Sequence, residues 1–113
     1  MLWHVVLLKP RPDLSGAERR ALVDTFADGV RVMPTIRAVR VGRRVTHGAA
    51  YERGAPDSAD YLLAIAFDDL AGLQAYLQHP AHDAIGARFG DSLSAALVYD
   101  FEVGGIDTLS TLV

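Results

Sequence analysis

The sequence contains no cysteine among its 113 residues. Disulfide frameworks, zinc sites built on thiolates and cysteine nucleophiles are therefore excluded. Basic residues are also few, since 11 Lys and Arg stand against 14 Asp and Glu, for a formal net charge of −3. Proteins that bind nucleic acids present a basic stripe to the phosphate backbone, so we expect no nucleic-acid partner.

Long hydrophobic runs are missing as well. Apolar runs such as Tyr61–Phe67 have the length of a strand, whereas a membrane-spanning helix needs roughly 18 apolar residues. The first residues lack the positively charged region of a secretory signal. A chain of this length usually forms one domain. These absences favour a small soluble protein of the cytoplasm that does not insert into membranes.

Hydrophobic periodicity indicates where the regular structure lies. Four runs have the length and composition of strands: Leu2–Leu8, Ile36–Val45, Tyr61–Phe67 and Ala96–Val103. A capping box formed by Ser15 and Glu18 opens an amphipathic helix, which we expect to end before Pro34. The first half of the chain is therefore predicted to alternate strand, helix and strand.

A second helical region precedes the last strand. Asp68 or Asp69 can cap its N-terminus, and Pro80 interrupts it. The residues expected to face inward recur at helical spacing: Leu70, Leu73 and Leu77 before the break, and Ile85, Phe89 and Leu93 after it. The sequence thus predicts a broken helical segment between the third and fourth strands.

The resulting order, β-α-β-β-α-β, is the ferredoxin-like pattern of α+β proteins, a four-stranded antiparallel sheet with helices on one face. Tyr61–Phe67 is apolar on both of its faces, so the face without helices also needs a cover. A second copy packed sheet-to-sheet would provide it, and we therefore expect a homodimer. Residues 1–103 form the predicted domain. The tail 104–113 contains four apolar residues after a glycine pair, and we expect it to wrap onto the partner subunit.

Proton-transfer groups cluster around the helix break. A histidine such as His82 can act as a general base near neutral pH, and the hydroxyl of Tyr76 can polarise a carbonyl. Because Pro80 breaks the helix, spacing does not give their relative orientation. A structural interpretation competes: His79 caps the end of the helix, His82 bonds to the backbone, and Tyr76 packs its ring.

His4 is the only polar residue of its strand. It is either a core histidine with a hydrogen-bond partner or a residue that lines a pocket. A metal site made from His79, His82 and Asp83 would be cramped and lacks the usual ligand spacing, so we expect no metal.

Residues Phe67–His82 read F-x-x-L-x-x-L-x-x-Y-x-x-H-P-x-H, which resembles the signature of the Dabb family, the stress-responsive A/B barrel domains. Supporting marks are His4 in the first strand, Val41-Gly42-Arg43 in the second and Val98-Tyr99-Asp100-Phe101 in the last. The resemblance covers about Leu2 to Val103. It implies a dimeric α+β barrel in which each subunit carries its own pocket.

Within that family the sequence is similar to plant polyketide cyclases that work without metal or cofactor. This similarity implies Tyr76 and His82 as a catalytic pair, His4 and His79 as substrate-binding residues, and no cofactor. The implied ligand is small and hydrophobic or polyketide-like, in a pocket between the sheet and the helical segment after Asp69. The alternative is a non-catalytic dimeric stress-response or ligand-binding protein. A monooxygenase is a third interpretation, which rests on the fold alone.

Overall fold

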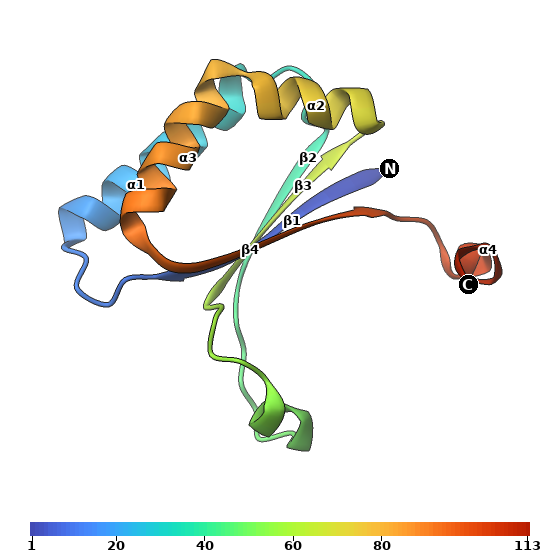
Figure 1. The fold of residues 1–113 in the computed structure, drawn as a ribbon, viewed down its shortest axis with the longest axis horizontal. Coiled ribbons are helices and arrows are strands. Elements are labelled where there is room, and N and C mark those ends of the chain that lie inside the picture. The colour runs from blue at the N-terminus through green and yellow to red at the C-terminus, as the bar shows by residue number, and fades with distance from the viewer.

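Four strands form one antiparallel sheet in the order β2-β3-β1-β4 in the computed structural model, which describes residues 1–113. The elements are β1 (Leu2–Pro10), α1 (Gly16–Val32), β2 (Ala38–Arg43), η1 (Ala50–Gly54), β3 (Tyr61–Phe67), α2 (Leu70–Gln78), α3 (Pro80–Ser92), β4 (Leu93–Glu102), η2 (Ile106–Thr108) and α4 (Leu109–Leu112). Helices α1, α2 and α3 lie on one side of the sheet (Figure 1). The predicted ferredoxin-like α+β architecture is confirmed.

The capping box predicted at the start of α1 is present. The Glu18 N–H donates to the Ser15 hydroxyl, and the Ser15 N–H donates to the Glu18 carboxylate, at 3.1 and 3.2 Å. At the other end, Met33 caps the helix directly before Pro34. Local residue chemistry therefore set both boundaries of this helix.

Three strands have boundaries that differ from the prediction. β2 spans Ala38–Arg43 and is shorter at both ends than the expected Ile36–Val45. β1 continues to Pro10, because its pairing with β4 shifts register between Lys9 and Pro10 and so accommodates a residue without an N–H. β4 begins at Leu93, which was expected on the helix, because the chain turns directly from α3 into extended backbone at this residue.

The inward stripe of α2 is also different from the predicted one. Leu73 and Tyr76 are buried, whereas Leu70 and Leu77 are exposed. At about 100° per residue, Leu70 and Leu77 share one direction on the helix, and Leu73 and Tyr76 point away from it to one side. In this orientation of α2, the Tyr76 ring packs against Phe67, with the ring centroids 5.2 Å apart.

The core fills the space between the sheet and the helices. Its main cluster consists of six buried residues: Met33, Ile65, Phe67, Leu73, Tyr76 and Ile85. Helices α1 and α3 approach closely at Gly29, where an added Cβ would lie 2.7 Å from Ile85 Cδ1. A larger residue at position 29 would push these helices apart.

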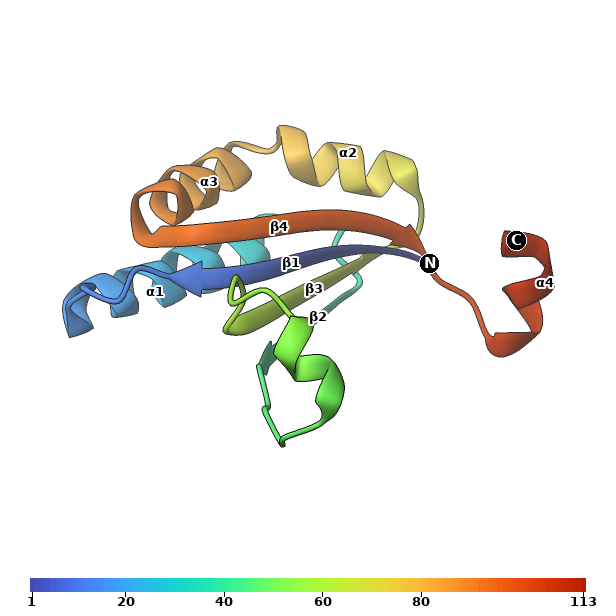
Figure 2. The ribbon, with the colours of Figure 1, turned by 60° about the horizontal axis from the view of Figure 1, so that its bottom comes forward.

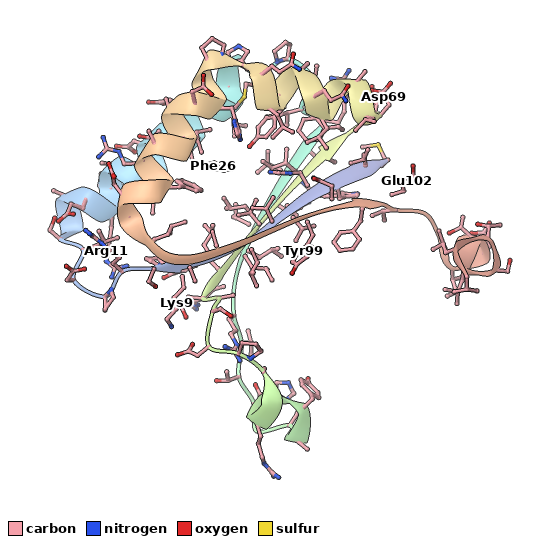
Figure 3. All side chains as sticks on the ribbon, viewed as in Figure 1. Lys9, Arg11, Phe26, Asp69, Tyr99 and Glu102 are labelled. Carbon is pink, nitrogen blue, oxygen red and sulfur yellow. The ribbon has the colours of Figure 1, made fainter.

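The side of the sheet without helices, called the open face below, is apolar along three strands. Strand alternation assigns to it Trp3, Val5, Leu7, Leu62, Ala64, Leu97, Tyr99 and Phe101. Tyr99 points away from the helices (Figure 3), and the Tyr99 and Phe101 rings are each 52% exposed. Neither α1, α2 nor α3 covers this surface.

Two segments extend away from the sheet and the three main helices. The connection from β2 to β3 contains η1, and the tail after β4 contains η2 and α4 (Figure 2). None of the helices has the length and apolar character that crossing a membrane requires.

Candidate active site

A cavity of about 350 Å³ lies between the sheet and α3. Strands β1, β3 and β4 and helices α1, α2 and α3 contribute to its wall. The lining residues with polar side chains are His4, Tyr76 and His82. Most of the others are aliphatic or aromatic. Apolar walls with a few convergent polar groups are typical of small-molecule sites.

His4 enters this cavity from the central strand. Its register places it opposite Ile65 on β3 and Asp100 on β4. The His4 side chain is buried, and its Nδ1 lies 2.7 Å from Asp100 Oδ1. Since a carboxylate only accepts hydrogen bonds, Nδ1–H is the donor. The pairing thus keeps a proton on Nδ1 of His4.

Tyr76 reaches the cavity from α2. It is 3% exposed and its ring lies between the rings of His4 and His82, with centroids 5.5 and 4.9 Å away. Burial, and secondly the negative charge of Asp100, raise the pKa of Tyr76 to about 12. The phenol therefore keeps its proton at neutral pH and can donate a hydrogen bond.

His82 lies in the first turn of α3, where its N–H donates to the His79 carbonyl at 2.9 Å. Its ring packs edge-on against Tyr76. Burial, followed by the imidazole of His4, lowers the pKa of His82, and Asp83 opposes this with a smaller effect. His82 is therefore uncharged at neutral pH, the form in which an imidazole accepts a proton.

His79 does not line the cavity with these three residues. Its backbone is extended, as is usual before a proline, and its N–H donates to the Tyr76 carbonyl. Its Nδ1 accepts a 3.0 Å hydrogen bond from the Ala81 N–H. His79 is thus the C-cap residue of α2, as expected, through its backbone N–H, while its side chain caps the start of α3.

Asp100 is the site residue that the sequence did not single out. Alternation along β4 places it with Val98 and Glu102 on the covered side of the sheet. The signal lay in two polar positions that face the same side of the sheet, His4 on the first strand and Asp100 on the last. Recognising it required the register between the first and last strands, which only the folded sheet defines.

The chain has no group of three or more His, Asp or Glu side chains arranged to hold a metal ion. The cavity contains the neutral imidazole of His82 and the protonated phenol of Tyr76, whose rings are in contact. Together they can accept a proton from carbon and donate a hydrogen bond to an oxygen.

Residues 2–103 match the family described as the Stress responsive A/B Barrel Domain. The chain belongs to this family. The match ends one residue after β4, so the tail 104–113 lies outside it. The family assignment agrees with the resemblance found in the sequence between Phe67 and His82.

Individual relatives are distant. Olivetolic acid cyclase of Cannabis sativa is 21% identical over 98 residues, which cover 87% of this chain and 92% of the cyclase. A dimeric ferredoxin-like protein of unknown function from Jannaschia sp. CCS1 has a TM-score of 0.69 and 26% identity, covering 90% of this chain and 98% of that one. Hydroxynitrile lyase from Passiflora edulis has a TM-score of 0.74 and 13% identity, covering 91% and 93%.

Proposed function

We propose that this protein is a cofactor-independent enzyme that carries out acid–base chemistry on a carbonyl compound. The reaction type is that of a polyketide cyclase. The observation that carries this proposal is the edge-to-face contact of the Tyr76 ring with both His4 and His82 in one apolar cavity. Two similar proteins are named as a cyclase and a hydroxynitrile lyase, which supports an enzymatic role on a small molecule.

The proposed reaction begins with removal of a proton from the carbon next to a carbonyl. Neutral His82 accepts this proton, and the Tyr76 hydroxyl donates a hydrogen bond to the carbonyl oxygen as the enolate forms. The enolate carbon then attacks a second carbonyl of the same molecule. A carbon–carbon bond forms, and protonated His82 returns its proton to the new alkoxide. No oxidant or reductant is consumed.

His4 and Asp100 serve as positioning residues in this proposal. The 2.7 Å hydrogen bond between them holds the His4 ring against the ring of Tyr76. Asp100 also contributes to the raised pKa of Tyr76. The pair thus keeps the phenol protonated and in place as a hydrogen-bond donor.

The substrate is expected to be small and hydrophobic or polyketide-like. No Lys, Arg, Asp or Glu lines the cavity, and its apolar residues suit a chain or ring of carbon atoms. The same lining would suit a protein that binds such a ligand without converting it, which is the second candidate function.

We also propose that two copies associate through the open face. Trp3, Tyr99 and Phe101 belong to an apolar surface of the kind that monomers seldom leave in contact with water. The similar protein from Jannaschia is described as dimeric, which supports this arrangement. Docking two open faces would close the sheets into a barrel. The tail 104–113 would then contact the partner subunit.

The experiment that tests the proposed chemistry is a cyclisation assay with linear poly-β-ketone substrates, comparing the wild type with Tyr76→Phe. This substitution keeps the ring that packs on Phe67 and removes only the hydroxyl. The proposal expects slower cyclisation with an unchanged melting temperature. Equal rates for the two proteins would reject Tyr76 as the donor, and binding without any cyclisation by either would favour the second candidate.

A further inference from the structure

The exposure of the lining residues shows where the cavity meets solvent. The residues from β1 and β3, together with Tyr76 and Ile85, are all buried and form its deep end. The exposed lining residues are Gly86, Gly90, Ala96 and Val98. They come from α3 and β4 alone. The entrance therefore lies between α3 and the edge strand β4.

The α3 side of this entrance is made by two glycines one helical turn apart. A Cβ added to Gly86 or Gly90 would meet no atom within 4 Å. Packing within the protein thus does not require glycine here, in contrast to Gly29, where Ile85 leaves no room. Glycine in a helix interior weakens the helix relative to alanine. Both positions therefore lower the stability of α3 and leave free space beside the entrance.

The deep end contains a polar group without a partner. Tyr76 is 3% exposed, and its hydroxyl has no hydrogen bond within the chain. The hydroxyl is not fully enclosed by protein atoms, so this free donor opens onto the cavity that the residue lines. This unpaired donor points to a ligand oxygen at the deep end.

The side chains at the entrance offer only non-polar contacts. Gly86 and Gly90 have no side chain, and those of Ala96 and Val98 are apolar. No cationic side chain lines any part of the cavity, so nothing in it would balance a phosphate or carboxylate. The part of a ligand that lies across the entrance must be uncharged.

We propose that Gly86 and Gly90 determine specificity by keeping this entrance open to the uncharged, apolar part of the ligand, while a ligand oxygen accepts the Tyr76 hydrogen bond. The inference rests on the proposed site but not on its chemistry. The two glycines of α3 then limit the width of the ligand, and Tyr76 of α2 binds its polar end.

The test uses the neutral dye Nile red as the probe, with binding followed by its fluorescence. Gly90→Leu places a branched side chain in the entrance and is expected to weaken Nile red binding by at least about tenfold. Gly86→Ala and Gly90→Ala are expected to bind the dye more weakly while raising Tm by about 4 °C through better helix propensity. An increase in stability together with a loss of binding is the signature that a structural role would not produce.

Gly16→Ala is the matched control, since Gly16 is also helical with open space around it but lies in α1 outside the cavity. It should leave dye binding unchanged. The proposal would be overturned if both α3 alanine variants and Gly90→Leu bound Nile red as the wild type does, with a higher Tm. It would also be overturned if the wild type bound Nile red and the anionic dye anilinonaphthalene sulfonate with equal affinity. Tyr76→Phe should weaken Nile red binding because it removes the proposed hydrogen bond, and unchanged binding would overturn the role given to α2. Dye binding needs no cyclisation substrate, so a wild type that binds Nile red but cyclises nothing would reject the proposed chemistry and leave this inference standing.

Discussion

The covered face and the open face of the sheet use the same strands for different purposes. On β1, His4 faces the helices and lines the cavity, whereas its neighbours Trp3 and Val5 face the other way. On β4, Asp100 pairs with His4, and the adjacent Tyr99 and Phe101 belong to the open face. Because side chains alternate along a strand, a shift of one residue would exchange the two sets.

The difference between the two faces explains where the polar side chains of the site come from. On the covered face, His4 is buried and pairs at 2.7 Å with Asp100, whose side chain remains partly exposed. The open face carries apolar and aromatic residues along β1, β3 and β4, and lacks a cover. The first arrangement suits chemistry on a small molecule, and the second suits contact with another protein surface.

The largest expected effect concerns the covered face. His82→Ala removes the proposed base and should lower the cyclisation rate by about 100-fold or more. Rates are measured alongside melting temperature, with His47→Ala as the control because His47 lies in the loop between β2 and β3. A variant that loses stability while keeping its rate would assign His82 a structural role.

The open face is tested by Phe101→Asp. Burying an unpaired carboxylate between two sheets is unfavourable, so the dimer dissociation constant should rise by at least about tenfold. Sedimentation over a range of concentrations measures it. Leu70→Asp is the control, since Leu70 is 55% exposed but belongs to α2. A wild-type protein that sediments as a 12.2 kDa monomer at micromolar concentration would contradict the proposed dimer.

Asp100→Asn tests the pairing that joins β4 to the site. An amide in place of the carboxylate no longer requires a proton on Nδ1 of His4, and we expect a rate loss of about tenfold, as for the removal of an outer partner of a functional histidine. The pKa of Tyr76 should also fall, because one cause of its rise is gone. Ultraviolet titration of the phenol measures this second effect, and an unchanged titration would show that burial alone sets the pKa.

The tail is a smaller contributor to the same interface. Deleting residues 104–113 removes four exposed apolar side chains, Ile106, Leu109, Leu112 and Val113. If they contact the partner subunit, the dimer should weaken by about fivefold, a change of roughly 1 kcal/mol. Sedimentation of both proteins checks this. A lower melting temperature with an unchanged dissociation constant would instead place the tail on its own subunit.

The smallest effect is that of pH on the rate. The pKa of His82 lies below its ordinary value of 6.5, so at pH 6.5 more than half of the imidazole remains neutral. The rate at pH 6.5 should therefore stay within about twofold of that at pH 7 and decline at lower pH. Folding stability follows the same sign, because the unfolded chain binds this proton first as the pH falls below 6.5. A rate that drops already above pH 7 would exclude His82 as the base.

Local sequence patterns determined most of the fold. The capping box at Ser15 and Glu18, the stop before Pro34 and the continuous apolar run Tyr61–Phe67 all act between residues close in the chain. They therefore specify element order and helix ends without reference to the rest of the molecule. The candidate pair Tyr76 and His82 was visible for the same reason, as two reactive side chains flanking a helix break.

Only the tertiary structure decided how those residues meet. His4 and Asp100 are 96 positions apart and become partners through the register of β1 and β4. The rotation of α2 turns Tyr76 inward and leaves Leu70 and Leu77 exposed, which packing against the sheet settles and helical spacing does not. His79 likewise caps the start of α3 because Pro80 holds the preceding backbone extended. Such outcomes depend on contacts between distant segments, whose register and rotation no local pattern encodes.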